Sequence, residues 1–411
     1  MNAVGIDVSK GRSTVAIIRP FGEIVRNPFD VNHTPKELDE LAKFILSLEG
    51  ESRVVFENTG KYSEPVIKVL SEAGIFVSPV NAKLIHDYGG DTIRRDKTDP
   101  IDSLKIAGFC LDKWTKLKRY SPVDEQRKML KTYNRQLDEY MRVKIMLKNN
   151  LISLTDQVFP DSNNLFSSPA RESDGHEKWI DFLAQFWHCD CVTSLSEEVF
   201  VERYKKWCKK HGYNFTSAKA SEIYNTAKNQ EATISKNDFT KTLILQAVEQ
   251  MNSICSAIAK LKAEMTKLAE ILPEYETVLA MHGVGKTLAP QLMAEIGDIR
   301  LFPKRSSLAR FAGIEPPENQ SGTYNQHSRR ISKQGSPQLR KTLFQVMRCV
   351  LQNSNPDEDT FRFISRKRTE GKPFKVYMIA GANKFLRIYY ARVKKCFDLL
   401  EENNSAKQEA V

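Results

Sequence analysis

Short apolar runs alternate with helical patterns over the first hundred residues. Residues 35–48 and 63–74 carry apolar side chains at helical spacing, and Gly74 ends the second of these helices. Runs rich in Val, Ile and Phe instead predict strands at residues 3–7, 13–20, 23–31, 52–57 and 75–80. Strands joined by short turns and followed by helix–strand units predict an α/β domain, in which helices cover a mixed sheet.

The pattern changes beyond residue 120. Apolar residues recur at alternating steps of three and four from Leu130 to Val158, interrupted only by Lys144, and again from Ile244 to Leu272. This spacing predicts two long helices in a coiled coil. The coiled coil could form between protomers or as an antiparallel hairpin within one chain, and the pattern alone favours neither.

Residues 161–235 separate the two long helices and begin with a polar, loop-like stretch. Zinc sites usually leave two or more residues between the first pair of ligands. The C-x-C…C-x-x-H arrangement in this insert is therefore a poor match, and packing cysteines are the favoured interpretation. The residues concerned are Cys189, Cys191, Cys208 and His211.

The excess positive charge of the chain, +11 in total, is confined to one block. Residues 300–395 contain 21 Lys and Arg against 6 Asp and Glu, whereas residues 1–299 contain 40 against 41. A solvated surface is one explanation. A surplus confined to a single block favours a polyanionic partner, and nucleic acid is the first candidate.

These patterns divide the chain into a sheet domain, long helices around a helical insert, a basic domain and an acidic tail. The predicted boundaries are 1–120 for the sheet domain, 121–160 and 236–272 for the coiled-coil helices, 161–235 for the insert, 273–395 for the basic domain and 396–411 for the tail.

Length and composition are typical of a globular protein of two or three domains, with 411 residues and 41% hydrophobic side chains. No apolar run approaches the ~18 residues that cross a bilayer, and the N-terminus has no apolar signal core. Seven scattered cysteines do not resemble a disulfide framework. We therefore expect a cytoplasmic protein without a membrane partner.

Four carboxylates lie at the ends of predicted elements. Asp7 ends the first strand and Glu57 ends the strand at 52–57. Asp99 and Asp102 lie one helical turn apart, where a helix would begin near Pro100. If the two strands are neighbours, the four carboxylates gather at one sheet edge, where their repulsion calls for cations. Two Mg²⁺ ions about 3.5–4 Å apart would meet that need and activate a phosphodiester.

Two alternatives exist for these carboxylates. In the first, Asp99 caps a helix and Asp102 is exposed one turn later. The stretch GIDVSK also resembles the opening of actin-like ATPases and sugar kinases, which place an Asp after a first strand. Those folds follow the Asp with Gly and Thr, whereas Val8 and Ser9 follow it here and no Gly-rich phosphate loop comes later. The kinase interpretation is therefore disfavoured.

Gly283 and Gly285 lie in a short turn, HGVGK, between two helical patterns. Glycines let backbone amides approach a phosphate closely, as in a helix-hairpin-helix, and Lys286 follows them directly. A tight turn without a ligand is the alternative. The basic block downstream favours nucleic acid.

Ser321 lies in a polar loop, PPENQSG, just ahead of a basic stretch. A Ser-Gly pair alone carries no weight, but a hydroxyl beside phosphate-binding side chains can attack a phosphodiester and be held covalently. Arg94 and Arg95, before the Asp99 helix, are further candidates for binding a DNA backbone. The basic residues after the serine are Arg329, Arg330, Lys333, Arg340 and Lys341.

Six segments occur in the order and approximate spacing of one family: VGIDVSK, FENTGKYSEPV, RRDKTDPIDS, HGVGKTLAPQLMAEIGD, LARFAGIEPPENQSG and RRISKQGSPQLRKTL. Over about 1–160 and 235–395 the chain resembles the DEDD transposases of insertion-sequence family number one hundred and ten. These are the bridge-RNA-guided recombinases, and Piv-type DNA invertases are their relatives. The resemblance implies a RuvC-like RNase H fold, then coiled-coil helices and a mostly α-helical transposase domain with a helix-hairpin-helix.

The resemblance also implies roles for single residues. Asp7, Glu57, Asp99 and Asp102 would form the tetrad that binds Mg²⁺, and Ser321 would be the nucleophile. Ser103 stands where the family usually has Ala.

A DNA recombinase with a covalent phosphoserine intermediate is the implied function. The expected partners are donor and target DNA, a noncoding guide RNA and further copies of the chain in a dimer or tetramer, with tetrad and serine supplied by different subunits. A site-specific DNA invertase, a hydrolytic RuvC-like nuclease without a covalent intermediate and a non-catalytic nucleic-acid-binding protein are the alternatives.

Overall fold

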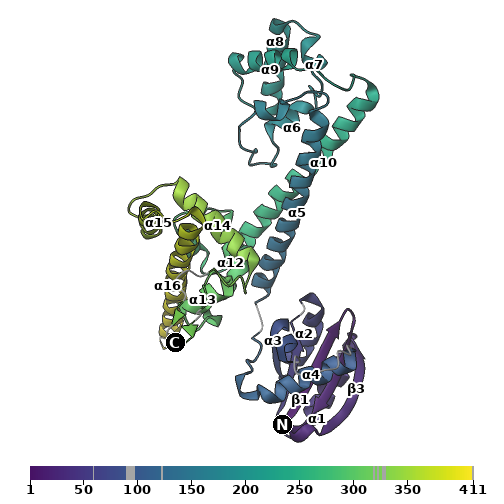
Figure 1. Ribbon diagram of the computed structural model, residues 1–411, viewed down its shortest axis with the longest axis vertical. Helices are drawn as coiled ribbons and strands as arrows, with labels where there is room; N and C mark the ends of the chain where they lie inside the picture. The colour runs from purple at the N-terminus through teal and green to yellow at the C-terminus, as the bar shows by residue number, and fades with distance from the viewer. Residues whose placement is uncertain are drawn as a thin grey trace. The chain divides into compact units, whose positions relative to one another are not determined.

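The computed structural model describes residues 1–58, 60–88, 98–121, 124–317, 320–321, 324–325 and 330–409, and for 320–321, 324–325 and 404–409 it describes the backbone alone. The chain forms two compact units, Met1–Pro122 and Val123–Val411, and each is described by itself (Figure 1). None of the helices in the described ranges combines the length and the apolar character that crossing a bilayer requires.

A five-stranded mixed sheet forms the centre of the first unit, with the strand order β3-β2-β1-β4-β5. The first three strands of the chain pair antiparallel, whereas β4 runs parallel to β1 and β5 runs parallel to β4. The mixed sheet expected from the apolar runs is therefore confirmed. Its strands are β1 (Asn2–Ser9), β2 (Arg12–Ile18), β3 (Ile24–Asn32), β4 (Ser52–Glu57) and β5 (Phe76–Val80).

Helices cover both faces of this sheet. Helices α1 (Pro35–Ser47) and α2 (Glu64–Glu72) pack on the face that carries Val4 and Ile6 of β1. Helices α3 (Ala82–Tyr88) and α4 (Asp99–Asp112) cover the opposite face, where Ala3 and Val55 are buried. Because side chains alternate along a strand, the odd-numbered residues of β1 and β4 all lie on the α4 face.

Gly5 allows α4 to lie directly on β1. A Cβ atom at this position would lie 2.2 Å from the backbone oxygen of Ser103 and 2.3 Å from the backbone nitrogen of Ala107. Ser103 is fully buried, and its hydroxyl donates a hydrogen bond of 2.9 Å to the backbone oxygen of Pro100. The absence of a side chain on β1 therefore sets how closely the first turns of α4 approach the sheet.

Two long helices, α5 (Glu125–Thr155) and α10 (Asp238–Glu270), begin the second unit and pack along each other (Figure 1). Leu151 near the end of α5 shares a core with Ile244 near the start of α10, so the pair is an antiparallel hairpin within one chain. Lys144, which interrupts the apolar pattern, pairs with Glu177 of the insert at 2.9 Å. Burial by itself lowers the pKa of Lys144, but the hydrogen bond to Glu177 and the interactions with the charges of Cys255 and Glu177 together outweigh burial, so the pKa is raised overall.

The insert folds at the end of this hairpin around an aromatic core that includes Phe182, Tyr204 and Trp207. Cys189 and Cys208 are buried in this core, and both thiols are free. Burial raises the pKa of the Cys189 thiol to about 11. The helices of the insert are α6 (Lys178–Leu183), α7 (Asp190–Thr193), α8 (Glu197–His211) and α9 (Ser217–Asn229).

The described residues of the remainder of the second unit are mostly helical, as expected, and include one short β6–β7 pair. Its core is continuous with the part of the α5–α10 hairpin formed by the start of α5 and the end of α10. Leu130 and Met265 of this part belong to the same apolar cluster as Leu343 and Phe385. The elements are α11 (Tyr275–Leu279), α12 (Leu288–Ile296), α13 (Arg305–Ala312), β6 (Gln320–Ser321), β7 (Tyr324–Asn325), α14 (Pro337–Gln352), α15 (Asp359–Thr369) and α16 (Phe374–Glu409).

Candidate active site

A row of polar residues crosses one edge of the sheet in the first unit. Ile6 and Phe56 are the last pair between β1 and β4, and Asp7 and Glu57 follow them directly, so the two carboxylates lie side by side. The prediction that β1 ends at Asp7 is wrong, since the strand continues to Ser9. Both side chains are half-buried. Their odd-numbered positions place them on the face that α4 covers. Two of the four predicted carboxylates are thus neighbours on adjacent parallel strands.

Helix α4 brings the other two carboxylates to the same face. Ile106 and Cys110 of α4 are buried against the sheet, and Asp99 and Asp102 extend this helix face toward the N-terminus. The cap prediction is wrong, since Asp99 is the first helical residue. Thr98 is the residue at the cap position, and its side chain makes no capping hydrogen bond.

The polar row continues across β2 and β3 with residues that sequence reasoning missed. Thr14 pairs with Asp7 across β1 and β2, and Asp30 pairs with Thr14 across β2 and β3. The hydroxyl of Thr14 donates a hydrogen bond of 2.7 Å to Oδ1 of Asp30. The register of the β2–β3 hairpin places Asp30 in this row, and the apolar pattern of the sequence does not determine that register.

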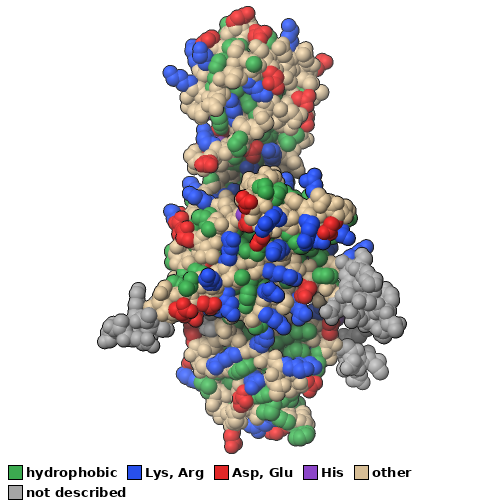
Figure 2. Space-filling view, turned by 90° about the vertical axis from the view of Figure 1, so that its left-hand side faces the viewer, with side chains coloured by type: hydrophobic (Ala, Val, Ile, Leu, Met, Phe, Trp, Pro, Cys, Tyr) green, Lys and Arg blue, Asp and Glu red, His purple; other side chains and the backbone are tan. Residues whose placement is uncertain are grey.

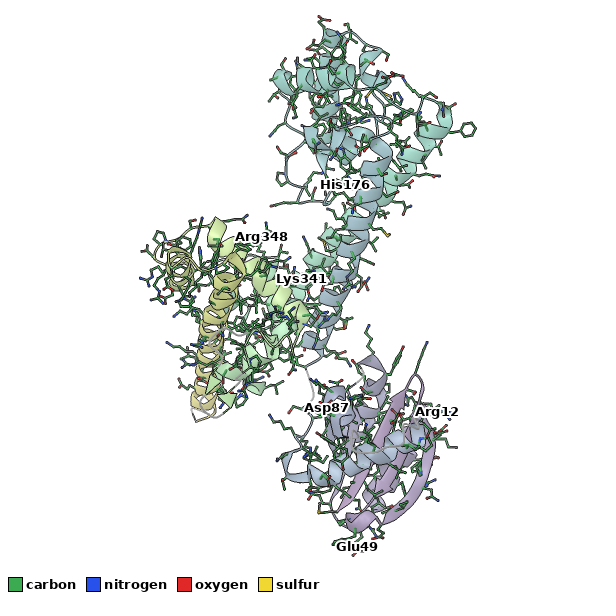
Figure 3. All side chains as sticks on the ribbon, in the orientation of Figure 1. Arg12, Glu49, Asp87, His176, Lys341 and Arg348 are labelled. Atoms are coloured by element: carbon green, nitrogen blue, oxygen red, sulfur yellow. The ribbon has the colours of Figure 1, made fainter. Side chains whose placement is uncertain are left out.

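Arg12 joins this row to α4. One terminal nitrogen of Arg12, which is labelled in Figure 3, lies 3.4 Å from Oδ2 of Asp30. The other lies 3.7 Å from Oδ2 of Asp99. Arg12 thus supplies positive charge between two carboxylates, one from β3 and one from α4. Within the described ranges, no group of three or more His, Cys, Asp or Glu side chains is close enough to hold a metal ion.

The segment with Ser321 is held at its base by α13 and the residues before α14. Beyond α13, the backbone nitrogen of Ser332 donates to the backbone oxygen of Glu315 at 3.1 Å. The backbone nitrogen of Lys333 donates to the backbone oxygen of Gly313 at 3.0 Å. Between these points, β6 and β7 pair antiparallel, with Ser321 opposite Tyr324. Only the backbone of Ser321 is described, at the end of β6.

Gly283 and Gly285, between α11 and α12, differ in their surroundings. Gly283 has φ +78°, and a Cβ there would lie 2.4 Å from Cγ2 of Val350, so this glycine permits close packing against α14. Gly285 faces open space, and Lys286 beside it is exposed. Gly285 and Lys286 are therefore the part of this turn that a phosphate could reach.

The basic residues after the serine fall into two groups. Arg340 and Lys341 have protein partners. Nη1 of Arg340 donates to the backbone oxygen of Ala312 at 3.0 Å. Nζ of Lys341, which is labelled in Figure 3, lies 2.7 Å from Oδ1 of Asp138. Arg330 and Lys333 are exposed. Arg94, Arg95 and Arg329 lie outside the described residues.

Positive side chains are frequent on the surface of the second unit. Figure 2 shows many Lys and Arg side chains (blue) across the middle of one face. Helix α15 is particularly rich in such side chains, with Arg362, Arg366, Lys367 and Arg368 among its 11 residues. A surface of this kind attracts phosphate backbones irrespective of base sequence.

Two family models match the chain. One, described as a transposase with the DEDD signature of IS110, matches residues 4–160, and the other, the transposase IS116/IS110/IS902 family, matches residues 275–361. Together they cover more than half of the chain. The chain belongs to the IS110 family of transposases. The first matched region of this IS110-family chain contains all four carboxylates, and the second contains the glycine turn and Ser321.

Individual relatives agree with this assignment. The IS110-family chain is 31% identical to the pilin gene-inverting protein of Moraxella bovis over 143 residues, which are 34% of this chain and 44% of that protein. The matched stretch thus spans less than half of the inverting protein. A 44.8 kDa protein of insertion element IS116 from Streptomyces clavuligerus is 19% identical over 402 residues, 95% of this chain and 94% of that protein. A probable family 20 transposase of Pseudomonas aeruginosa is 25% identical over 153 residues, 37% of this chain and 45% of that protein.

Proposed function

We propose that this protein is a DNA recombinase that cuts and rejoins DNA strands through a covalent phosphoserine intermediate. The observation that carries the proposal is the arrangement of the first unit. Asp7 and Glu57 lie on adjacent strands, on the face over which α4 places Asp99 and Asp102. The sheet, with three antiparallel strands followed by two parallel ones, supports a RuvC-like RNase H fold.

The four carboxylates would hold Mg²⁺. Their oxygen atoms are the ligand type that Mg²⁺ prefers, and all four lie toward one face of the sheet. Because no three of them are close enough to hold an ion in the described structure, the carboxylates would have to move together to bind one. When bound, the metal would polarise the scissile phosphate and stabilise the charge of the attacking and leaving oxygens. Because Arg12 already pairs with Asp99 at 3.7 Å, Asp99 would have to leave Arg12 before it could serve as a ligand.

Ser321 would be the nucleophile. Its hydroxyl oxygen forms a bond to phosphorus, the bond from phosphorus to one deoxyribose oxygen breaks, and that oxygen takes up a proton as a free hydroxyl. Attack on the phosphoserine by a hydroxyl of the partner strand releases the serine and reseals the backbone. The phosphoester bond is conserved throughout, so no ATP is needed. Tetrad and serine would come from different subunits of a dimer or tetramer.

Guidance by a noncoding RNA would supply the choice of site. The exposed basic side chains and the Gly285–Lys286 turn suit contacts with backbones of any sequence, and such contacts carry no base information. The specificity would then come from pairing of an RNA with donor and target DNA. The protein expressed with the DNA that flanks its gene should co-purify with a discrete RNA from that locus. Site-specific joining by nuclease-treated, RNA-free protein would instead indicate direct reading by side chains.

DNA inversion is the second candidate function, because the chain is 31% identical over 143 residues to the pilin gene-inverting protein of Moraxella bovis. Inversion and insertion share the same chemistry. A hydrolytic nuclease does not, since it leaves no protein joined to DNA.

Incubation with DNA, Mg²⁺ and co-purified RNA, followed by denaturing electrophoresis, separates these classes. We expect a covalent protein–DNA species from the wild type. Asp102→Asn should abolish cleavage while thermal unfolding and DNA binding stay near wild type, because a half-buried carboxylate is replaced by an amide of the same shape. Clean nicks without adducts would indicate a nuclease, and cleavage at the wild-type rate by Asp102→Asn would remove Asp102 from the site.

A further inference from the structure

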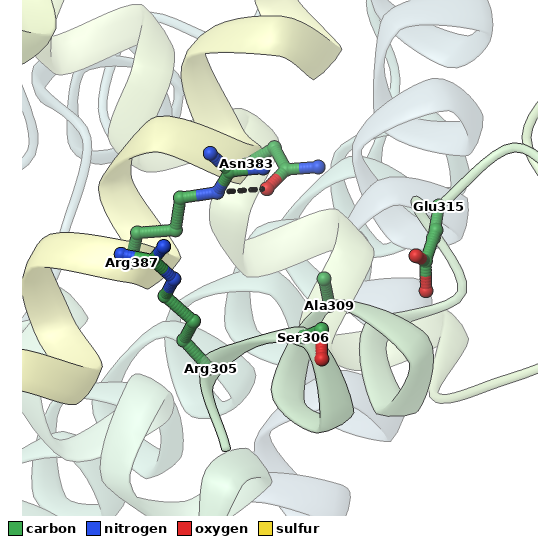
Figure 4. Close-up of a pocket in the computed structure, with 6 residues that line it drawn as sticks. All are labelled: Arg305, Ser306, Ala309, Glu315, Asn383 and Arg387. Carbon is green, nitrogen blue, oxygen red and sulfur yellow. Dashed lines mark hydrogen bonds between the residues drawn. The ribbon is translucent and has the colours of Figure 1, made fainter.

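A small cavity lies where α13 and α16 meet. It has a volume of about 100 Å³, which is several times what a single water molecule needs. Both helices contribute cationic and polar side chains to it (Figure 4). Its walls are formed by Arg305, Ser306, Ala309, Glu315, Asn383 and Arg387.

The guanidinium groups of Arg305 and Arg387 line this cavity, and neither is paired with a carboxylate in the described part of the chain. Nε of Arg387 donates to Oδ1 of Asn383 at 3.2 Å, which orients the guanidinium (Figure 4). Glu315 pairs with Nε of Arg310 at 3.0 Å, so its charge is already compensated. Two uncompensated arginines around one cavity favour an anion with several oxygen atoms.

The cavity also borders the segment that carries Ser321. Glu315 lines it, and the backbone of Glu315 accepts the hydrogen bond from Ser332 that closes this segment. Both ends of the serine segment therefore meet at the wall of the cavity. An anion bound here would lie at the base of the proposed nucleophile loop.

We propose that this cavity binds one backbone phosphate of the DNA strand that Ser321 attacks. The inference rests on the proposed function and names a contact for its substrate. Arginine forks bind phosphate oxygens through paired N–H groups, and Ser306, in the first turn of α13, adds a hydroxyl donor where the helix dipole favours negative charge. A phosphate held here fixes the strand beside the serine segment, and DNA is favoured over RNA because DNA is the strand that the serine cuts.

The test compares the full-length wild type with Arg305→Gln/Arg387→Gln. The control, Lys394→Gln/Lys395→Gln, removes the same charge from exposed positions further along α16. Binding of a 20-base-pair DNA duplex is measured over a series of salt concentrations, and adduct yield is measured with Mg²⁺, locus RNA and the DNA that flanks the gene. One lost phosphate contact should reduce the salt slope by about 0.9.

We expect the salt slope of the arginine variant to fall by this amount and its adduct yield to fall at least tenfold. The lysine variant should keep its adduct yield within twofold of the wild type. Equal losses in both variants, or no change in the arginine variant, would overturn the proposal. The same binding measurement is made with an RNA duplex. If the salt slope of the arginine variant changes with the RNA duplex and not with the DNA duplex, the cavity binds RNA and the proposal is overturned. A wild type that forms no adduct, together with a slope change specific to the arginine variant, would refute the proposed chemistry and leave the phosphate site standing. Thermal unfolding checks each variant, and Arg387→Gln alone replaces the double variant if that one unfolds.

Discussion

Substitution of Gly5 by Ala tests whether close packing of α4 on β1 sets the carboxylate site. The added Cβ would lie 2.2 Å from the backbone oxygen of Ser103 and 2.3 Å from the backbone nitrogen of Ala107, against 3.4–4 Å for an ordinary contact. Both neighbours are backbone atoms and cannot turn aside. The first turns of α4 would therefore have to retreat from the sheet by roughly 1 Å, and Asp99 and Asp102 would retreat with them.

The expected losses follow from that displacement. Overpacking of a close-packed interior costs about 1–3 kcal/mol, and backbone atoms on both sides place Gly5→Ala at the upper end of that range. A displacement of about 1 Å in groups that position a reaction lowers the rate by roughly 100-fold. We therefore expect about 3 kcal/mol less unfolding free energy in the first unit and about a hundredfold slower DNA cleavage.

Cys110 reports directly on the position of α4. It is fully buried on the sheet-facing side of the helix, and burial raises the pKa of its thiol to about 12. At pH 8 only about one molecule in ten thousand carries the reactive thiolate, so folded wild type should resist alkylation at this residue. Labelling with N-ethylmaleimide and peptide mass spectrometry should show faster modification of Cys110 in Gly5→Ala.

Gly108→Ala is the matched control, because it adds the same methyl group to α4 itself. A Cβ at Gly108 would meet only the side chain of Tyr88, at 3.3 Å and beyond, and Ala is the better helix former by about 0.5–1 kcal/mol. This control should keep wild-type cleavage and Cys110 protection. If Gly5→Ala matches the wild type in unfolding, labelling and cleavage, the packing argument is refuted.

Two further predictions concern ion pairs. Arg12→Gln should lower the Mg²⁺ concentration for half-maximal cleavage by up to about fivefold, since the pair with Asp99 is half-exposed and worth at most about 1 kcal/mol. Arg26→Gln is the control, because it removes a guanidinium of β3 that lies over the Phe29 ring. A higher Mg²⁺ requirement in Arg12→Gln would contradict competition between Arg12 and Mg²⁺ for Asp99. Glu274→Gln should cost the second unit about 3–5 kcal/mol in urea unfolding, because it removes the buried carboxylate that pairs with the buried Arg127 guanidinium. Asp138→Asn, which breaks the more exposed pair with Lys341, should cost under about 1 kcal/mol, and equal costs would show that burial of the Arg127 pair is unimportant.

Much of the first unit could be predicted from its sequence, because each strand is a short apolar run and each helix has one apolar face. The runs around Ile6 and Phe56 are such strands. The two heptad patterns predicted the long helices, but not whether Leu151 would meet Ile244 of its own chain or of another, since both pairings bury the same apolar stripe. Lys144 interrupts the pattern because it pairs with Glu177, a residue far along the chain that periodicity cannot reveal.

The candidate site was only partly visible in the sequence. Asp7 and Glu57 could be found because each ends a predicted strand, although β1 continues to Ser9. Asp102 could be found because it follows a helix start. Asp30 could not, since its place beside Thr14 depends on hairpin register. The same limit applies to Arg305 and Arg387, which lie on different helices and meet only after the second unit has folded.

The most direct test of the central claim is to locate the covalent bond between protein and DNA. The wild type is incubated with Mg²⁺, its co-purified RNA and DNA from its own locus, then digested with nuclease and protease and analysed by mass spectrometry. We predict a nucleotide mass on the peptide that contains Ser321, joined through the serine oxygen, and its loss in Ser321→Ala. A nucleotide on another residue, such as Thr323 or Ser328, or cleavage without any modified peptide, would contradict the account.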